Sequence, residues 1–295
     1  MPSYRISVPG PRNGWEADQM RVLLRAQLKR MGQTGLDWDI EEIRMGNRTV
    51  FLLFNHNRKK RMNGEKEIQK SLGMTVAEYI VTVNEPHVIR KIIQRVFHFR
   101  HPDDSRKIEQ YALHLLDDSE ADEPPYRKRK ERMARQVMRY LNQHHVLAVD
   151  GFFHFRLKHY RDGLIRLVEH AVDEFLLEQE YREFIELLRY FVSIQQPKCS
   201  LVHVLHIEKR QFRLLDRKGD PLQLKDMGSI AQDLLEQPFS HEDLIVSTLL
   251  TVAPKQVVLH TQNPEENVIR TLEQVFESRM TLCDGCSSCL PHLRR

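Results

Sequence analysis

The chain has 295 residues, with 45 Lys and Arg against 41 Asp and Glu, so its formal net charge of +4 is small for its length. Binding to nucleic acid or another polyanion would therefore require a local basic patch. Hydrophobic residues make up 41% of the chain and charged residues 29%, which is typical of a folded globular protein. No apolar run has the length of a membrane span, and the N-terminus lacks the features of a signal peptide. We therefore expect a cytoplasmic protein without a membrane span.

The N-terminal residues 1–56 predict a small β-α-β-β unit. Residues 4–8 read as a short strand, and apolar residues then recur at helical spacing over 20–31. A glycine-asparagine pair at 46–47 separates two β-prone runs, which is typical of a hairpin with a two-residue turn.

The middle of the chain, residues 67–196, predicts a helical domain behind a polar, basic linker at 57–66. The first long helix is expected to break near Pro86, because proline has no amide hydrogen to donate and crowds the preceding turn. The acidic segment 117–125 ends in two prolines and predicts a loop. A long pair of helices is expected over 152–195.

The C-terminal residues 197–295 predict a mixed α/β unit that opens with a hairpin. Two helices are expected at about 225–236 and 241–252. A strand at 256–260, a helix and a strand at 279–283 then form a β-α-β crossover. The fold class is therefore α+β, with three domains at 1–56, 67–196 and 197–295.

Three stretches carry a resemblance to a known family. They are GFFHFRLKHYRDGLIRLVEHAVDEFLLEQEYREFIELLRYFVSIQ (151–195), HEDLIVSTLLTVAPKQVVLHT (241–261) and ESRMTLCDGCSSC (277–289). Together they resemble the YtxC-like family of sporulation proteins from endospore-forming bacteria. The resemblance implies a cytoplasmic protein linked to sporulation and supplies no catalytic residues. The family's C-terminal cysteines correspond here to Cys283, Cys286 and Cys289.

These three cysteines form a C-x2-C-x2-C array, and they are three of only four in the chain. The same spacing supplies three ligands of a [4Fe–4S] cluster in bacterial ferredoxins, whose fourth cysteine comes from elsewhere. Zinc is the alternative, with His292 completing a Cys3His set. Cys199 or an external group could also supply the fourth ligand. A third interpretation is a redox-active thiol cluster.

A basic helix over 127–139 is the other candidate site. One stripe of this helix carries Lys128, Arg132, Arg135 and Arg139, with apolar residues roughly opposite. Such a stripe could lie along the phosphates of a nucleic acid. The alternative is a solvent-exposed face, partly neutralised by the acidic residues at 117–123.

No motif of a hydrolase, a nucleotide-binding loop or a zinc protease occurs in the sequence. His203 and His206 lie three apart in a predicted strand, so they should face opposite sides and not form a metal pair. We therefore expect a non-enzymatic interaction or regulatory protein that acts with protein partners in sporulation. The alternatives are a metal-binding or thiol-redox protein and, third, a nucleic-acid-binding protein.

Overall fold

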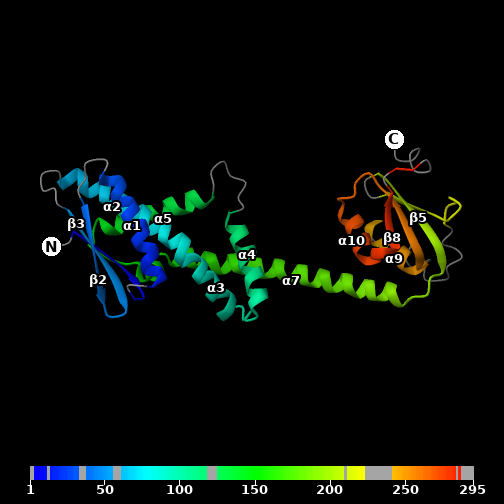
Figure 1. The fold of residues 1–295 in the computed structure, drawn as a ribbon, viewed down its shortest axis with the longest axis horizontal. Helices are drawn as coiled ribbons and strands as arrows, with labels where there is room; N and C mark the ends of the chain where they lie inside the picture. Colours follow the sequence, from blue (N-terminus) through cyan, green and yellow to red (C-terminus); the bar gives the residue numbers. More distant parts are fainter. Residues whose placement is uncertain are drawn as a thin grey trace. The chain divides into compact units, whose positions relative to one another are not determined.

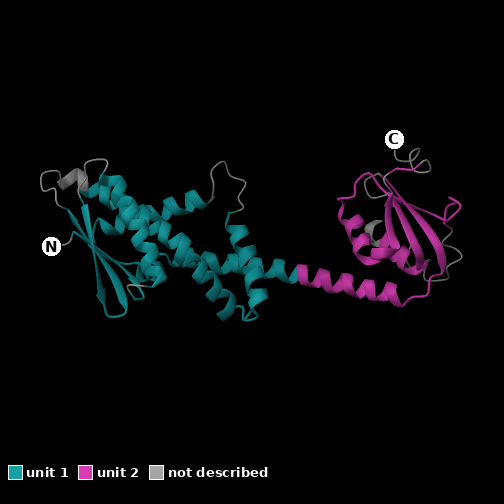
Figure 2. Cartoon of the chain, in the orientation of Figure 1, with its two compact units in different colours: residues 1–177 teal, residues 178–295 magenta. Residues whose placement is uncertain are grey.

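The structure is a computed structural model that describes residues 3–11, 14–32, 38–55, 61–117, 125–208, 211–222, 241–283 and 285–286. The chain divides into two compact units, Met1–Leu177 and Glu178–Arg295 (Figure 2). The boundary between them falls inside the long helix α7 (Lys158–Ile194).

A mixed four-stranded sheet opens the first unit. Its strands are β1 (Tyr4–Pro9), β2 (Trp38–Met45), β3 (Arg48–Asn55) and β4 (Val146–Ala148), in the order β2-β3-β1-β4. The predicted hairpin is confirmed: β2 and β3 are antiparallel and turn at Gly46, whose φ of 60° suits glycine. The sequence did not predict β4, which runs parallel to β1.

Helices make up the rest of the first unit. They are α1 (Trp15–Gly32), α2 (Arg61–Tyr79), α3 (Glu85–Arg95), α4 (Pro102–Asp117), α5 (Pro125–Leu141), α6 (Val149–Arg156) and the start of α7 (Figure 1). The predicted break near Pro86 is present as a π-helical segment, Ile80–Asn84, with the proline in the first turn of α3. The backbone stays helical through this segment, where the Glu85 amide bonds to the Ile80 oxygen five residues back, and Pro86 follows with no amide hydrogen to donate.

One hydrophobic core joins the N-terminal strands to these helices. Tyr4, Ile6 and Phe51 from the sheet belong to the same buried cluster as Ile68 and Val76 from α2. The pairing of β4 with β1 adds a second link between the start of the chain and its helical part. Sheet and helices therefore share one core in this unit.

Residues 61–66, predicted as the second half of a linker, are helical, because α2 begins at Arg61. The remaining linker residues and the predicted loop at 118–124 lie outside the described residues. The three-domain division into 1–56, 67–196 and 197–295 remains a prediction, whereas the chain forms the two compact units given above.

The second unit has its own mixed sheet. Its strands are β5 (Cys199–Glu208), β6 (Gln211–Leu215), β7 (Pro254–His260) and β8 (Met280–Cys283), in the order β6-β5-β7-β8. Its helices are α9 (His241–Val252), α10 (Asn267–Phe276), a single 3-10 turn (Glu277–Arg279) and the second half of α7. The predicted helix at 225–236 lies outside the described residues.

The predicted β-α-β crossover is confirmed, since β7 and β8 are parallel neighbours joined by α10. Val202 and Leu259 on one face of the sheet pack with Leu249 of α9 and Ile269 of α10. The α+β class, with a helical middle between two mixed sheets, is therefore as predicted. Within the described part of the chain, no helix combines the length and apolar character needed to cross a membrane.

The close crossing of α2 and α5 depends on Gly73. A Cβ added at this position would lie 2.6 Å from Met138 Cγ and 2.9 Å from the backbone oxygen of Ala134. Side chains can move aside, but the backbone of a packed helix cannot. Glycine is therefore required at this point of contact.

We predict that Gly73→Ala lowers the free energy of unfolding by about 1–3 kcal/mol, as overpacking in a core does. Gly163→Ala in α7 is the matched control, because nothing lies within 4 Å of its added Cβ. That control should be neutral or stabilise by up to about 1 kcal/mol through helix propensity. Urea denaturation followed by circular dichroism measures both, and equal effects would contradict the close crossing.

Candidate metal centre

The carboxyl ends of β7 and β8 bring a histidine and a cysteine together. His260 is the last residue of β7, Cys283 is the last residue of β8, and the two are direct partners in the parallel pairing. Register partners in a sheet project to the same face. The alternate residues Leu259 and Leu282 pack against the helices, so His260 and Cys283 lie on the opposite face of this sheet.

Cys286 joins this pair through a turn at Gly285. The glycine has a φ of 120°, a backbone conformation that residues with a side chain rarely adopt. Its turn places Cys286 Sγ 3.9 Å from His260 Nδ1. The potential ligand atoms of His260, Cys283 and Cys286 all lie within 4.8 Å of one another.

These separations suit a single metal ion. With Zn–S bonds of about 2.3 Å and Zn–N bonds of about 2.0–2.1 Å, tetrahedral geometry separates N and S ligands by about 3.6 Å. The observed 3.9 Å between Cys286 Sγ and His260 Nδ1 is close to that value. Small side-chain rotations would therefore bring this pair to the edge length of a zinc site.

His260 is held in the form that binds metal. The side chain is buried, with the residue only 3% exposed. Burial lowers the pKa of His260, and the neighbouring His203 lowers it further. The imidazole is therefore neutral at neutral pH, and a neutral ring nitrogen is what a metal requires.

His203 of β5 fixes the orientation of the His260 ring. His203 Nδ1 lies 3.0 Å from His260 Nε2, and the two rings stack with their planes 28° apart. With His260 Nδ1 as the metal ligand, Nε2 carries the hydrogen and donates it to His203 Nδ1. Metal-bound histidines usually donate a hydrogen bond from the ring nitrogen that does not bind the metal, because this bond sets the tautomer and strengthens the ligand.

His206 has different partners from His203, as strand alternation predicts. Its Nδ1 lies 2.8 Å from Thr261 Oγ1, and its ring stacks on Phe212. Its Nε2 is 3.4 Å from a carboxylate oxygen of Glu266. His206 is therefore a buried structural residue beside the site and not one of the clustered ligands.

The structure brings two of the four predicted metal ligands together, Cys283 and Cys286. The other two, Cys289 and His292, lie outside the described residues. Cys199 pairs with Pro254 at the start of β7, roughly 20 Å along the strand from His260 at about 3.3 Å per residue. It is therefore too far away to complete the site.

The sequence analysis missed His260. Its signal was present, since the predicted strands 256–260 and 279–283 end in this histidine and in Cys283. Strands joined by a crossover are parallel, so their last residues meet at one edge of the sheet.

The predicted basic stripe is solvent-exposed on α5. All four of its residues, Lys128, Arg132, Arg135 and Arg139, are exposed. The apolar residues opposite them, among which are Met133, Val137 and Leu141, are buried in the core.

Comparisons with known proteins identify relatives without a stated activity. The model of the YtxC-like family matches residues 70–281. A Bacillus subtilis (strain 168) protein, named uncharacterized protein YtxC, is 27% identical over 219 residues, which are 73% of this chain and 77% of the relative. No solved structure matches the chain. The family match includes His203 and His260 and ends two residues before Cys283.

We predict that His203→Leu weakens zinc binding by about 10- to 100-fold, as loss of a hydrogen-bond partner to a metal-bound histidine does. His203→Gln, whose amide oxygen can still accept the hydrogen bond, should keep more of the affinity. Competition with a chromophoric zinc chelator measures both variants. Unchanged affinity in His203→Leu would show that His260 does not bind the metal through Nδ1.

Proposed function

Because the chain belongs to the YtxC-like family, whose relative above is named uncharacterized, we propose its function from its own site. The C-terminal unit binds one zinc ion through His260, Cys283 and Cys286. The observation that carries this proposal is the convergence of the three ligand atoms within 4.8 Å at one edge of a sheet.

Zinc fits this ligand set better than an iron–sulfur cluster does. Clusters of the ferredoxin type are held by four thiolates, whereas the described set is one imidazole and two thiolates. Mixed sets of cysteine and histidine in tetrahedral geometry are typical of structural zinc sites. The fourth ligand is Cys289 or His292, the two candidates that the sequence places next along the chain.

The metal has a structural or regulatory role in this proposal. Strand β8 is short, with 4 residues, and among the described strands it pairs only with β7. A metal bound by both strands and by Cys286 would fasten the C-terminal segment to the sheet. Because a preformed site rarely exists in an unfolded chain, the binding free energy would add to the stability of this unit.

At the level of the cell, we propose a cytoplasmic, non-enzymatic protein that acts in sporulation through protein partners. Its resemblance to sporulation proteins and its lack of catalytic motifs support this role. Thiolate ligands also suit a reducing compartment. A partner is supported by the exposed apolar side chains on α7, which include Phe184, Leu187, Tyr190 and Ile194 at 51–64% exposure. Large exposed apolar patches commonly mark interaction surfaces.

We predict near-stoichiometric zinc in protein that is purified anaerobically, measured by mass spectrometry of its metals. The double variant Cys283→Ser/Cys286→Ser should lose the zinc, because each change removes a thiolate ligand. Cys199→Ser is the matched control and should keep it, since burial raises the pKa of this distant thiol and disfavours the thiolate.

Two results would contradict the zinc proposal. Iron with acid-labile sulfide in place of zinc would indicate a cluster. Metal-free protein whose Cys283 and Cys286 form a reversible disulfide would indicate thiol-redox chemistry, the alternative that the spacing of the array also permits.

We also predict that deleting the gene from an endospore-forming host lowers the number of heat-resistant spores. The Cys283→Ser/Cys286→Ser allele should reproduce this defect if the metal is needed, and the Cys199→Ser allele should sporulate normally. Normal spore counts in the deletion strain would refute the sporulation role without bearing on zinc binding in the purified protein.

A further inference from the structure

The positive charge of the chain is concentrated in one stretch of the first unit. Residues 125–166 contain eleven Lys and Arg and three Asp and Glu, a net charge of +8, whereas the whole chain carries +4. The remaining residues therefore sum to −4. This stretch forms α5, β4, α6 and the start of α7.

Most of these cations have no carboxylate partner among the residues that the structure describes. Three are paired: Arg127 with Glu131, Arg129 with Glu85, and Lys130 with Glu78. Across the described ranges, no ion pair to a carboxylate neutralises the other eight, which are Lys128, Arg132, Arg135, Arg139, Arg156, Lys158, Arg161 and Arg166. Such cations attract and bind a polyanion more strongly than paired ones.

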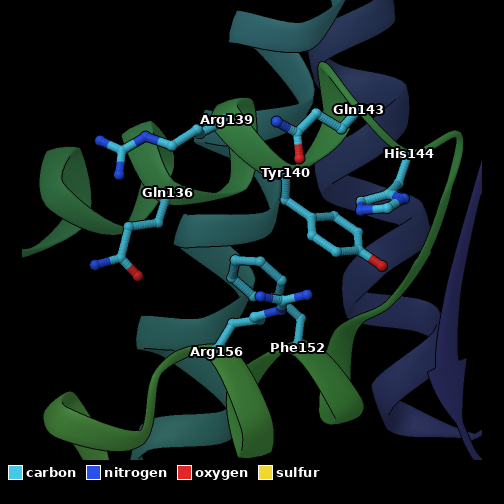
Figure 3. A pocket seen from close by; sticks show the side chains of 7 residues that line it. All are labelled: Gln136, Arg139, Tyr140, Gln143, His144, Phe152 and Arg156. Carbon is cyan, nitrogen blue, oxygen red and sulfur yellow. The ribbon is translucent and has the colours of Figure 1, made fainter.

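Two of these arginines line a hollow between α5 and α6 (Figure 3). Arg139 comes from α5 and Arg156 from the end of α6, and the hollow has a volume of about 340 Å³. Tyr140 projects between the two helices, with the Arg156 guanidinium 5.8 Å from its ring centre and Phe152 edge-on at 5.3 Å. His144 and two glutamines complete the lining with further hydrogen-bonding groups.

The hollow continues along α5. Gln136 lines this hollow and two more, with volumes of about 350 and 430 Å³. Arg132 lines both of the added hollows, and their floor includes Leu116 and Tyr160. We call the three hollows together the α5 groove. It combines an apolar and aromatic floor with cations that have no carboxylate partner in the described part of the chain.

An exposed aromatic side chain lies beside the groove. Phe155, the residue before Arg156 on α6, is 76% exposed. It is three residues from Phe152, which lines the groove, so both lie on neighbouring positions of the helix surface. An aromatic ring left in water on a basic surface is what a stacked base requires.

We propose that the α5 groove binds single-stranded nucleic acid. Arg132, Arg139 and Arg156 contact successive phosphates, and Phe155 stacks on a base. The groove favours a single strand over a duplex, because its hollows and apolar floor can accept unstacked bases that a duplex keeps inside. The sequence had identified only the α5 side of this surface; Arg156 and Phe155 of α6 are added by the structure.

The test is fluorescence anisotropy of the full chain with a labelled, unstructured single-stranded oligonucleotide at low and moderate salt. We expect binding that weakens with salt. Arg139→Glu/Arg156→Glu should reduce the affinity at least tenfold at low salt. It should also make the slope of log K against log salt shallower by about 1.4, since each phosphate contact of a single strand contributes about 0.7. Phe155→Ala should reduce the affinity about tenfold through lost stacking.

The matched control is Arg25→Glu/Lys29→Glu, which makes the same change in net charge on two exposed residues of α1. It should bind as the wild type does, because α1 does not line the groove. If circular dichroism shows that the glutamate variant is poorly folded, Arg139→Gln/Arg156→Gln takes its place. This variant removes the two charges without reversing them and should also bind the oligonucleotide more weakly than the wild type.

Four outcomes would overturn the proposal. The first two are no binding by the wild type at low salt and an equal loss of affinity in the α1 control. The third is tighter binding to a duplex of the same sequence. The fourth is competition by free phosphate or a mononucleotide at the same concentration as an unlabelled oligonucleotide. The last of these would indicate a site for a small anion only.

Discussion

The candidate metal centre depends on the register of two parallel strands. Val257 and Leu259 of β7 and Leu282 of β8 must face the helices to bury their side chains. Side chains alternate along a strand, so this burial forces His260 and Cys283 onto the other face. A slip of β8 by one residue would turn Cys283 into the core and separate the ligands. Burial of the apolar face therefore sets the geometry of the polar site on the opposite face of the sheet.

The sequence contains enough information to predict His260 as part of the candidate site. The predicted C-terminal ends of the two strands and the crossover between them are confirmed. Combining them would have placed His260 beside Cys283, because joined parallel strands end at one edge. The sequence pattern could not predict the contact of His203 with His260. This contact depends on the pairing of β5 with β7, and the two residues lie 57 positions apart in the sequence.

Local sequence patterns did not predict two other elements, β4 and the first turns of α2. β4 has only 3 residues, and it is a strand because β1 is free to pair with it on that side. Residues 61–66 have few apolar side chains and a glycine, so their composition resembles a linker. They are helical as the first turns of α2, whose later residues pack in the core. In each case a tertiary contact decides the local structure.

In the proposed zinc site, electrostatic charge bears on the choice of the fourth ligand. Zn²⁺ with the thiolates of Cys283 and Cys286 and the neutral ring of His260 is neutral overall. Adding Cys289 would leave the site with a charge of −1, whereas His292 would keep it neutral. His260 is buried and Cys283 and Cys286 are half-buried, and an uncompensated charge is costly where water is excluded. His203 can donate no compensating hydrogen bond through Nδ1, since that atom accepts one from His260. Charge balance therefore favours His292 over Cys289 as the residue that completes the site.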